Sequence, residues 1–407
     1  MPGFNPVIIA VRGQEEAEER LKKTGCAEMG LSIMARKARH YCIQAEDVPS
    51  PAALILKQEM LSLAAEAAVS QKALTNDPQK GKVVLMGTLA QFEALSQKLK
   101  PQPFGLSELG GELVSLIKKS ERKRFSLKLK KGTLELGEKP VLMGVLNLTP
   151  DSFFDGGKYS DPEAALSAAE RMIEQGAEII DLGGESSRPG SATVPLEEEL
   201  RRVMPVMEKI ASRAGKAFIS IDTRKSKVAR RAMDHGADII NDISALGEDE
   251  KMAAVAAETG AGLVLMHVKG SPKDMQKYPV YNDLFGEVSR FLRERIERAV
   301  SAGVDEEKIM VDPGIGFGKT VEHNLELVRD LWRLRGLGRP IILGPSNKRF
   351  IGAVLNAEKD DRFEGTAASV VAGILAGAHI IRVHDPGGMR KFAIMAGAIR
   401  AARNIFA

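Results

Sequence analysis

Apolar and polar residues alternate with two different periods along the chain from about residue 140 to the C-terminus. Short aliphatic runs, which predict buried parallel strands, are separated by longer stretches in which apolar residues recur every three or four positions. Val203, Met207 and Ile210 show this helical spacing within residues 195–213. We expect eight strands, which cover residues 142–148, 177–183, 217–222, 238–243, 262–268, 309–312, 340–344 and 379–385.

Eight strand and helix units in succession predict an α/β fold, the (β/α)8 TIM barrel, whose ligand site lies at the carboxyl ends of the strands. A doubly wound open sheet is the alternative fold. A strand that only packs a core has no reason to finish in charged or amide side chains. Nearly all of these strands do so, in chain order with Asn147, Asp181, Asp222, Asn241 with Asp242, His267, Asp312, Ser346 through Lys348, and Arg382 with His384.

Residues before about 125 follow a different pattern. Residues 6–11 and 82–86 are strand-like, residues 15–23 are helical, and residues 50–68 predict a long amphipathic helix. We therefore expect a small α/β or α+β N-terminal domain of unknown function over residues 1–125, followed by a catalytic domain over residues 126–407. The basic run at residues 118–131 predicts a solvated linker and a hairpin.

Composition narrows the classes of partner. The net charge of +4 is small for 407 residues and no arginine-rich face stands out, so we expect no nucleic-acid partner. The two cysteines, Cys26 and Cys42, are too few for a disulfide framework. The chain has no apolar run long enough to span a membrane and no signal-peptide pattern. We expect a soluble cytoplasmic protein that binds small acidic metabolites.

Six short motifs together are typical of one protein family. They are NLTPDSFFDGG at 147–157, GGESSRPG at 183–190, SIDT at 220–223, IIND at 239–242, DPGIGFGK at 312–319 and RVHD at 382–385. With these motifs in this order, the chain from about residue 126 resembles dihydropteroate synthase, one of the pterin-binding barrels. The resemblance implies a transferase, commonly a homodimer, that acts in folate biosynthesis. It condenses 6-hydroxymethyl-7,8-dihydropterin diphosphate with 4-aminobenzoate and releases 7,8-dihydropteroate and pyrophosphate.

The resemblance implies a pterin site deep in the barrel. A pterin edge carries an amino group and ring N–H donors, which suit the carboxylates of Asp222 and Asp312. In the family, the positions of Met266 and Phe317 wall the pocket, and that of Lys348 reaches the acceptor atoms of the ring. The implied pterin-binding set is Asp222, Asn241, Met266, Asp312, Phe317 and Lys348.

Departure of the diphosphate leaves positive charge on the pterin methylene carbon and negative charge on the leaving group, so the site must stabilise both charges. Guanidinium groups match phosphate oxygens in geometry and charge, which favours Arg188 and Arg382, together with His384, as diphosphate ligands. Asn147 would help to position a Mg²⁺ cofactor that arrives with the diphosphate.

Two glycine-bounded loops, residues 149–157 and 185–190, have the composition of loops that cover active sites. In the family these loops help to form the 4-aminobenzoate pocket, which here would also involve Asp155. The implied 4-aminobenzoate set is Ser187, Arg188, Pro189, Ser346 and Lys348. The residues implied to act in catalysis are Lys348, Asp155 and Arg188.

This side of the site also departs from the family. The family usually has Ser-Arg-Lys-Ser where residues 346–349 are Ser-Asn-Lys-Arg, so Asn347 replaces the arginine and Arg349 lies two places further on. Ser187 and Phe154 stand where Thr and Ser are commoner. We therefore expect altered affinity for 4-aminobenzoate or for sulfonamides.

Two rival functions share part of this pattern. A pterin-dependent methyltransferase barrel would have similar Asp and Asn contacts, but it has no evident use for Lys348 with Arg382. A non-catalytic pterin-binding scaffold would not need intact diphosphate and lysine residues. A phosphate-binding Walker A loop is excluded at residues 312–320, because Pro313 stands where that loop needs glycine.

Overall fold

The computed structural model describes residues 4–75, 80–149, 162–186, 191, 193–270, 275 and 279–402. The chain divides into two compact units, Met1–Glu121 and Arg122–Ala407, slightly before the boundary expected near residue 125. Separate hydrophobic clusters form the cores of the two units. That each unit is an independent domain stays a prediction.

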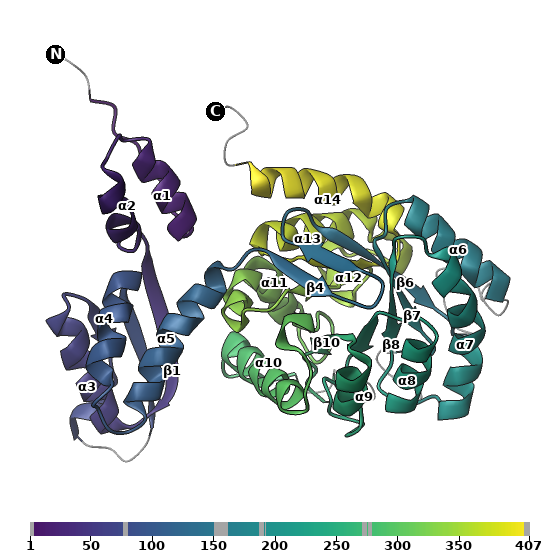
Figure 1. Ribbon diagram of the computed structural model, residues 1–407, viewed down its shortest axis with the longest axis horizontal. Helices are drawn as coiled ribbons and strands as arrows, with labels where there is room; N and C mark the ends of the chain where they lie inside the picture. The colour runs from purple at the N-terminus through teal and green to yellow at the C-terminus, as the bar shows by residue number, and fades with distance from the viewer. Residues whose placement is uncertain are drawn as a thin grey trace. The chain divides into compact units, whose positions relative to one another are not determined.

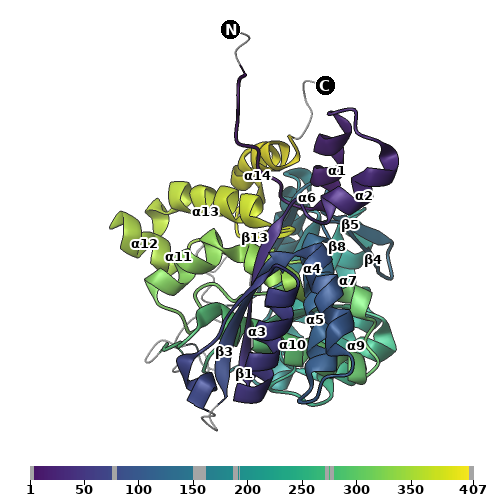
Figure 2. The same ribbon diagram turned by 90° about the vertical axis from the view of Figure 1, so that its left-hand side faces the viewer.

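The first unit contains an antiparallel sheet in the order β1-β3-β2, formed by β1 (His40–Val48), β2 (Glu66–Ala68) and β3 (Gly81–Thr88). Its helices are α1 (Gln14–Lys22), α2 (Glu28–Ala35), α3 (Ser50–Ser62), α4 (Leu89–Leu99) and α5 (Leu106–Glu121). Leu56, Leu85 and Phe92 lie in the hydrophobic core of this unit. Helices α3, α4 and α5 lie beside the sheet (Figure 2). An antiparallel sheet with helices packed on it makes this unit an α+β fold.

Two local expectations for this unit are wrong. Residues 6–11 form no strand, because they pair with no described strand, and Val7 and Ile8 are exposed. The helix expected over residues 50–68 ends at Ser62. Ala64 adopts a φ of 52°, which no α-helix continues, and the chain then enters β2.

The second unit is an eight-stranded parallel barrel, as the sequence predicted (Figure 1). Its strands are β6 (Val141–Asn147), β7 (Ile179–Gly183), β8 (Phe218–Asp222), β9 (Ile239–Asp242), β10 (Gly262–Met266), β11 (Ile309–Asp312), β12 (Ile342–Leu343) and β13 (Ile380–Val383). Hydrogen bonds join them in the order β11-β10-β9-β8-β7-β6-β13-β12. The parallel bridge between Val311 and Ile341 joins β11 to the start of β12 and so closes the ring. The open-sheet alternative is therefore excluded.

Helices follow the strands and surround the ring (Figure 1). They are α6 (Pro162–Glu174), α7 (Leu196–Arg213), α8 (Ser226–Asp234), α9 (Met252–Thr259), α10 (Leu284–Ser301), α11 (Val321–Arg329), α12 (Arg349–Leu355), α13 (Phe363–Ala376) and α14 (Pro386–Ala401). Helix α7 shows why these segments fold so. Val203, Met207 and Ile210 are buried on one face, and three glutamates in its first turn favour the positive end of the helix dipole. No helix in the described ranges is long and apolar enough to cross a bilayer.

A hairpin of β4 (Phe125–Lys128) and β5 (Thr133–Leu136) packs against the amino ends of the barrel strands. Its buried residues join a cluster of strand residues that includes Val141 and Met143. Lys131 ties it down, since its backbone N–H donates to Asp238 Oδ1 over 3.1 Å and its Nζ donates to the Ala217 carbonyl over 2.7 Å. The hairpin expected at this basic run is therefore present, but its apolar side chains are buried in a plug, where we had expected a solvated segment.

Candidate active site

The carboxyl ends of the strands bring polar residues from distant parts of the chain side by side. In the parallel register Asp222 lies opposite Asn241 on one side and opposite Gly183 on the other, and Met266 lies opposite Asp312. Asp222, Asn241 and Asp312 are all buried. Because these side chains share one end of a closed ring, they can contact a single ligand.

Arg382, on β13, joins this group from the other side of the ring. Its Nε donates to Asp181 Oδ2 over 2.7 Å, and its Nη2 donates to Asp222 Oδ2 over 2.7 Å. Asn241 Nδ2 donates to the same Asp181 oxygen over 3.0 Å. The guanidinium of Arg382 therefore donates to two buried carboxylates, and Asp181 also binds the amide of Asn241.

Burial changes the proton affinity of these groups. It raises the pKa of Asp222 to about 7; Arg382 opposes this rise, and the carboxylates of Asp181 and Glu199 add to it. Burial also raises the pKa of Asp312, although the Gly314 N–H donates to its carboxylate over 2.7 Å. Burial acts to lower the pKa of Arg382, but Asp181 and Asp222 outweigh it, and the net pKa is raised.

An apolar wall stands beside these charges. Met266 and Phe317 are buried and belong to one small cluster with Ile243 and Met275. Lys348, at the N-cap of α12, places its ammonium 4.3 Å from the centre of the Phe317 ring, within the range of a cation–π contact. The wall therefore offers both a flat apolar surface and a cation.

Ser346 and His384 meet at the ends of β12 and β13. The Ser346 Oγ lies 3.0 Å from His384 Nδ1 and accepts a longer hydrogen bond from the His384 backbone N–H, at 3.4 Å. Asn347 follows with a φ of 57°, a left-handed conformation that asparagine tolerates better than most residues. The local backbone therefore favours asparagine at position 347.

A buried lysine lies behind the wall. Lys319 Nζ is 3.0 Å from His267 Nδ1 and donates to the Phe317 carbonyl over 2.9 Å. Burial lowers the pKa of Lys319 to about 7 and that of His267 to about 2, so the imidazole is neutral and accepts from the lysine. Lys319 therefore links the Phe317 carbonyl to the His267 ring.

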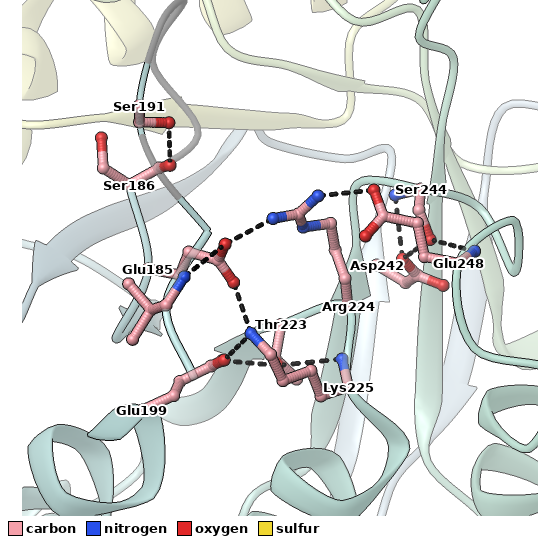
Figure 3. Close-up of polar contacts among 11 residues, drawn as sticks. Glu185, Ser186, Ser191, Glu199, Thr223, Arg224, Lys225, Asp242, Ser244 and Glu248 are labelled. Carbon is pink, nitrogen blue, oxygen red and sulfur yellow. Dashed lines mark hydrogen bonds and ion pairs between the residues drawn. The ribbon is translucent and has the colours of Figure 1, made fainter. Parts of the chain in front are cut away.

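A charged network ties the loop after β7 to the loop after β8 (Figure 3). Lys225 Nζ lies 2.6 Å from Glu185 Oε2 and 2.5 Å from Glu199 Oε2, and the Thr223 hydroxyl donates to Glu199 Oε1 over 2.6 Å. Arg224 Nη2 also donates to Glu185, at 2.5 Å. Glu199 is fully buried, so this network is fixed in place rather than screened by solvent.

Glu185 also joins the two ends of its own loop, because its Oε1 accepts from the Val194 N–H over 3.2 Å. The Ser191 hydroxyl donates to the Ser186 carbonyl over 2.6 Å in the same loop (Figure 3). A pocket beside Asp222 is lined by Glu185, Ser186, Asp222, Thr223, Arg224 and Ile243. The network thus forms one wall of a hollow next to the buried carboxylates.

The remaining sequence-predicted residues are less connected. Asn147, at the end of β6, is half-buried and lies opposite Gly183 in the register, on the same rim as Asp222. Asp155, Ser187, Arg188 and Pro189 lie outside the described residues, as does Phe154.

Sequence reasoning placed Asp181 and His267 among the polar strand ends but gave them no ligand, and it gave no role to Lys319 or to the network around Glu185. A signal existed for Asp181, because a carboxylate in the middle of an apolar run, as in residues 179–183, is costly unless it is paired. No comparable signal marks Lys225 or Glu199, which resemble ordinary charged residues of a solvent-exposed helix or loop.

Comparison with known proteins agrees with this geometry. Residues 143–384 match the model of the family described as pterin binding enzyme. Dihydropteroate synthase of Escherichia coli K12 is 48% identical over 246 residues, which cover 60% of this chain and 86% of that protein. A crystal structure of Yersinia pestis dihydropteroate synthase with a sulfonamide drug aligns with a TM-score of 0.66 and 42% identity, over 68% of this chain and all of that one.

A longer relative also covers the first unit in part. A probable bifunctional folylpolyglutamate synthase/dihydropteroate synthase of Halobacterium salinarum is 40% identical over 382 residues, which cover 91% of this chain. The chain spans only 44% of that relative. The barrel, its buried carboxylates and these matches together show that the chain belongs to the dihydropteroate synthases of the pterin-binding enzyme family, which are transferases of the folate pathway.

Proposed function

We propose that this chain condenses 6-hydroxymethyl-7,8-dihydropterin diphosphate with 4-aminobenzoate and releases 7,8-dihydropteroate and pyrophosphate. Membership of the dihydropteroate synthases supports the reaction. The observation that carries the proposal is one buried polar cluster, in which Asn241 and Arg382 both donate to Asp181 and Arg382 also donates to Asp222. The apolar wall of Met266 and Phe317 is the second part of the site. Such a site offers acceptors for the donors of a pterin next to a cation for its diphosphate.

The pterin binds among the buried acceptors. Asp222 and Asp312 accept from the ring N–H and amino groups of the pterin, and the carbonyl oxygen of Asn241 accepts a further donor. Phe317 and Met266 contact the flat faces of the ring. The Lys348 ammonium, beside the Phe317 ring, donates to the acceptor atoms of the pterin.

Arg382, His384 and Arg188 bind the diphosphate, and the cationic side chains stabilise the charge that develops on it. Asn147 would hold a Mg²⁺ through its amide oxygen, which suits a hard cation that takes its other ligands from diphosphate oxygens and water. The described residues include no cluster of three or more His, Cys, Asp or Glu side chains that could hold a metal. When bound, the metal neutralises charge on the leaving group.

The reaction is a dissociative displacement. The bond between the pterin methylene carbon and the diphosphate oxygen breaks, and its electron pair leaves with the diphosphate. The neutral amine of 4-aminobenzoate then donates its electron pair to the methylene carbon, and one proton passes from its nitrogen to water. The second substrate binds to Asp155, Ser187, Arg188, Pro189 and Ser346, with Lys348 shared between the substrates.

A direct assay tests this function. The purified protein of residues 1–407 is incubated with Mg²⁺, the pterin diphosphate and 4-aminobenzoate, and both pyrophosphate and dihydropteroate are measured. Formation of both products in equal amounts is the expected result. A methyltransferase barrel or a non-catalytic scaffold would form neither, so the absence of both products from folded protein contradicts the proposal.

We further propose that the chain forms a homodimer, as members of the family commonly do. Exposed apolar side chains on α13 and α14 support this, because Leu375, Ile394, Met395 and Ile399 are each more than two-fifths exposed. Light scattering should give the mass of a dimer for the full chain and of a monomer for Ile394→Glu. A monomeric wild type, or a dimeric Ile394→Glu variant, would contradict this interface.

We also propose that the two units are independent domains and that the enzyme works in the cytoplasm. Deletion of residues 1–121 should leave a folded barrel with normal kcat and KM. Loss of activity from a folded barrel would show that the first unit takes part in the reaction. Cell fractionation tests the location.

A further inference from the structure

Asp181 is a buried carboxylate that the reaction described above does not use. It lies in the middle of β7 and is fully buried. One of its oxygens, Oδ2, receives all of its hydrogen bonds, at 3.0 Å from Asn241 Nδ2 and 2.7 Å from Arg382 Nε. Its other oxygen, Oδ1, is buried and has no partner among the described residues.

The contact with Asn241 fixes the orientation of its amide. A carboxylate can only accept hydrogen bonds, so the group of Asn241 that faces Asp181 must be its NH₂. The carbonyl oxygen of Asn241 is then directed elsewhere, which is the orientation needed to accept from a pterin donor. Without Asp181, nothing in the described structure distinguishes this orientation from the flipped one.

The contact with Arg382 fixes the guanidinium. Asp181 takes the Nε edge, and Nη2 lies 2.7 Å from both Asp181 Oδ2 and Asp222 Oδ2. The third nitrogen, Nη1, has no hydrogen bond to a described residue. Asp181 therefore fixes one edge of the planar guanidinium, and the N–H donors of Nη1 can bind a phosphate oxygen.

We propose that Asp181 is a positioning residue for the reaction, whose single carboxylate sets the orientation of both Asn241 and Arg382. It thereby couples the binding of the pterin ring to the binding of the diphosphate. This inference rests on the proposed function, because it assigns Asp181 a role through two of the substrate-binding residues.

Ser220 provides a matched control on the neighbouring strand. It lies opposite Asp181 in the parallel register, it is fully buried, and its hydroxyl also has no partner among the described residues. It contacts neither Asn241 nor Arg382 by a hydrogen bond. Ser220→Ala therefore changes a buried polar group at the same depth in the barrel without changing either substrate-binding residue.

The test compares pterin diphosphate binding by calorimetry for Asp181→Ala, Asp181→Asn and Ser220→Ala, each checked for folding by thermal unfolding. Asp181→Ala removes both contacts and should raise the Kd by about 10- to 100-fold. Asp181→Asn keeps one acceptor oxygen and should lose only about threefold to tenfold. Ser220→Ala should bind like the wild type.

The pH dependence of binding gives a readout that a merely structural role would not move. Four charged groups act on Asp222, namely Arg382 from β13, Asp181 from β7, Glu199 from α7 and Arg224 from the loop after β8. Asp181 is one of the groups that raise the pKa of Asp222. Asp181→Asn should therefore lower that pKa, and pterin binding should persist to lower pH than in the wild type.

Wild-type affinity and an unchanged pH profile in both Asp181 variants would overturn the inference, as would an equal loss in Ser220→Ala. If Asp181→Ala does not fold, Asp181→Asn decides the matter through the pH profile. Failure of the proposed function is distinguishable, because the wild type itself would then bind no pterin diphosphate and form no dihydropteroate.

Discussion

The two ends of the barrel are built from the same eight strands but hold opposite kinds of side chain. At the amino ends, Val141, Met143 and their neighbours pack under the β4–β5 hairpin in an apolar plug. At the carboxyl ends, the buried carboxyl groups of Asp222 and Asp312 lie on the same rim as the half-buried guanidinium of Arg382. A protein can bear the cost of buried charge at one end because apolar burial at the other end stabilises the same strands.

Of the substitutions considered, Asp312→Ala should have the largest effect, and that effect should be on pterin binding and not on stability. The substitution leaves the donors of the pterin unpaired in a buried site, so pterin affinity should fall by about 1,000-fold in calorimetry. Asp238→Ala is the matched control, because Asp238 is an equally buried aspartate at the amino end that accepts from the Ile219 and Lys131 N–H groups. It should reduce stability but not pterin affinity. Near-normal affinity in Asp312→Ala would refute the role of this residue.

Leu127→Ala, at the amino end of the barrel, should lower stability without changing substrate binding. Leu127 is fully buried in the plug, so its truncation should lower the free energy of unfolding by about 3 kcal/mol in urea titrations. The kcat and KM of the folded fraction should not change. Leu325, which is exposed on α11, gives the control, since Leu325→Ala should cost less than about 0.5 kcal/mol. A changed KM in Leu127→Ala would show that the two ends are coupled.

The next largest effect should be a pH dependence of pterin binding, which only the carboxyl end of the barrel should show. The pKa of Asp222 is about 7, above its ordinary 3.8, so lowering the pH through 7 protonates an acceptor of the pterin. Pterin affinity should fall by up to about tenfold per pH unit below 7. Protein stability should change in the opposite direction. As the pH falls from 7 to 4, the folded state binds a proton at Asp222 that the unfolded state does not yet bind, so the folded protein becomes more stable. Asp222 therefore destabilises the folded protein most above pH 7. In Asp222→Asn, binding should be weaker but its pH dependence flatter; an unchanged slope would contradict the assignment.

Asn347→Arg should show the smallest effect. A left-handed φ of 57° disfavours arginine, so the variant should lose about 1 kcal/mol of stability. Asn356→Arg is matched, because Asn356 is exposed and also left-handed, with a φ of 51°. Affinities for 4-aminobenzoate and for a sulfonamide should change only in Asn347→Arg. If they remain unchanged there, residue 347 does not explain any altered affinity of this chain.

The barrel could be predicted from the sequence because its signal is local and repeated. Each of the eight strands is a short aliphatic run, and all eight were found near the expected bounds. The β4–β5 hairpin was also expected, but its burial was missed, because the lysines of residues 118–131 suggested a solvated segment. Leu127 and Leu129 alternate with exposed Lys128 and Lys130, and this period of two indicates a strand with one buried face.

The candidate site could be predicted only where a residue carries its own signal. Asp222, Asn241 and Arg382 end strands, and the structure brings these three together around Asp181. Pairings such as Lys225 with Glu199, or Lys319 with His267, depend on which side chains the fold brings into contact. No period or motif records that information, since it arises from tertiary packing.

The neighbouring position of β6 and β13 has a consequence for how the protein folds. The first and last strands of the ring pair with each other, and Arg382 is 201 residues from Asp181 and 160 from Asp222. Contacts of such long sequence separation form late and slow the folding reaction. During synthesis, the ring stays open until β13 leaves the ribosome. Until then Asp181 and Asp222 lack the guanidinium of Arg382 that pairs with them. The binding site should therefore be the last part of the barrel to assemble, and a nascent chain that stops short of β13 should be a target for chaperones.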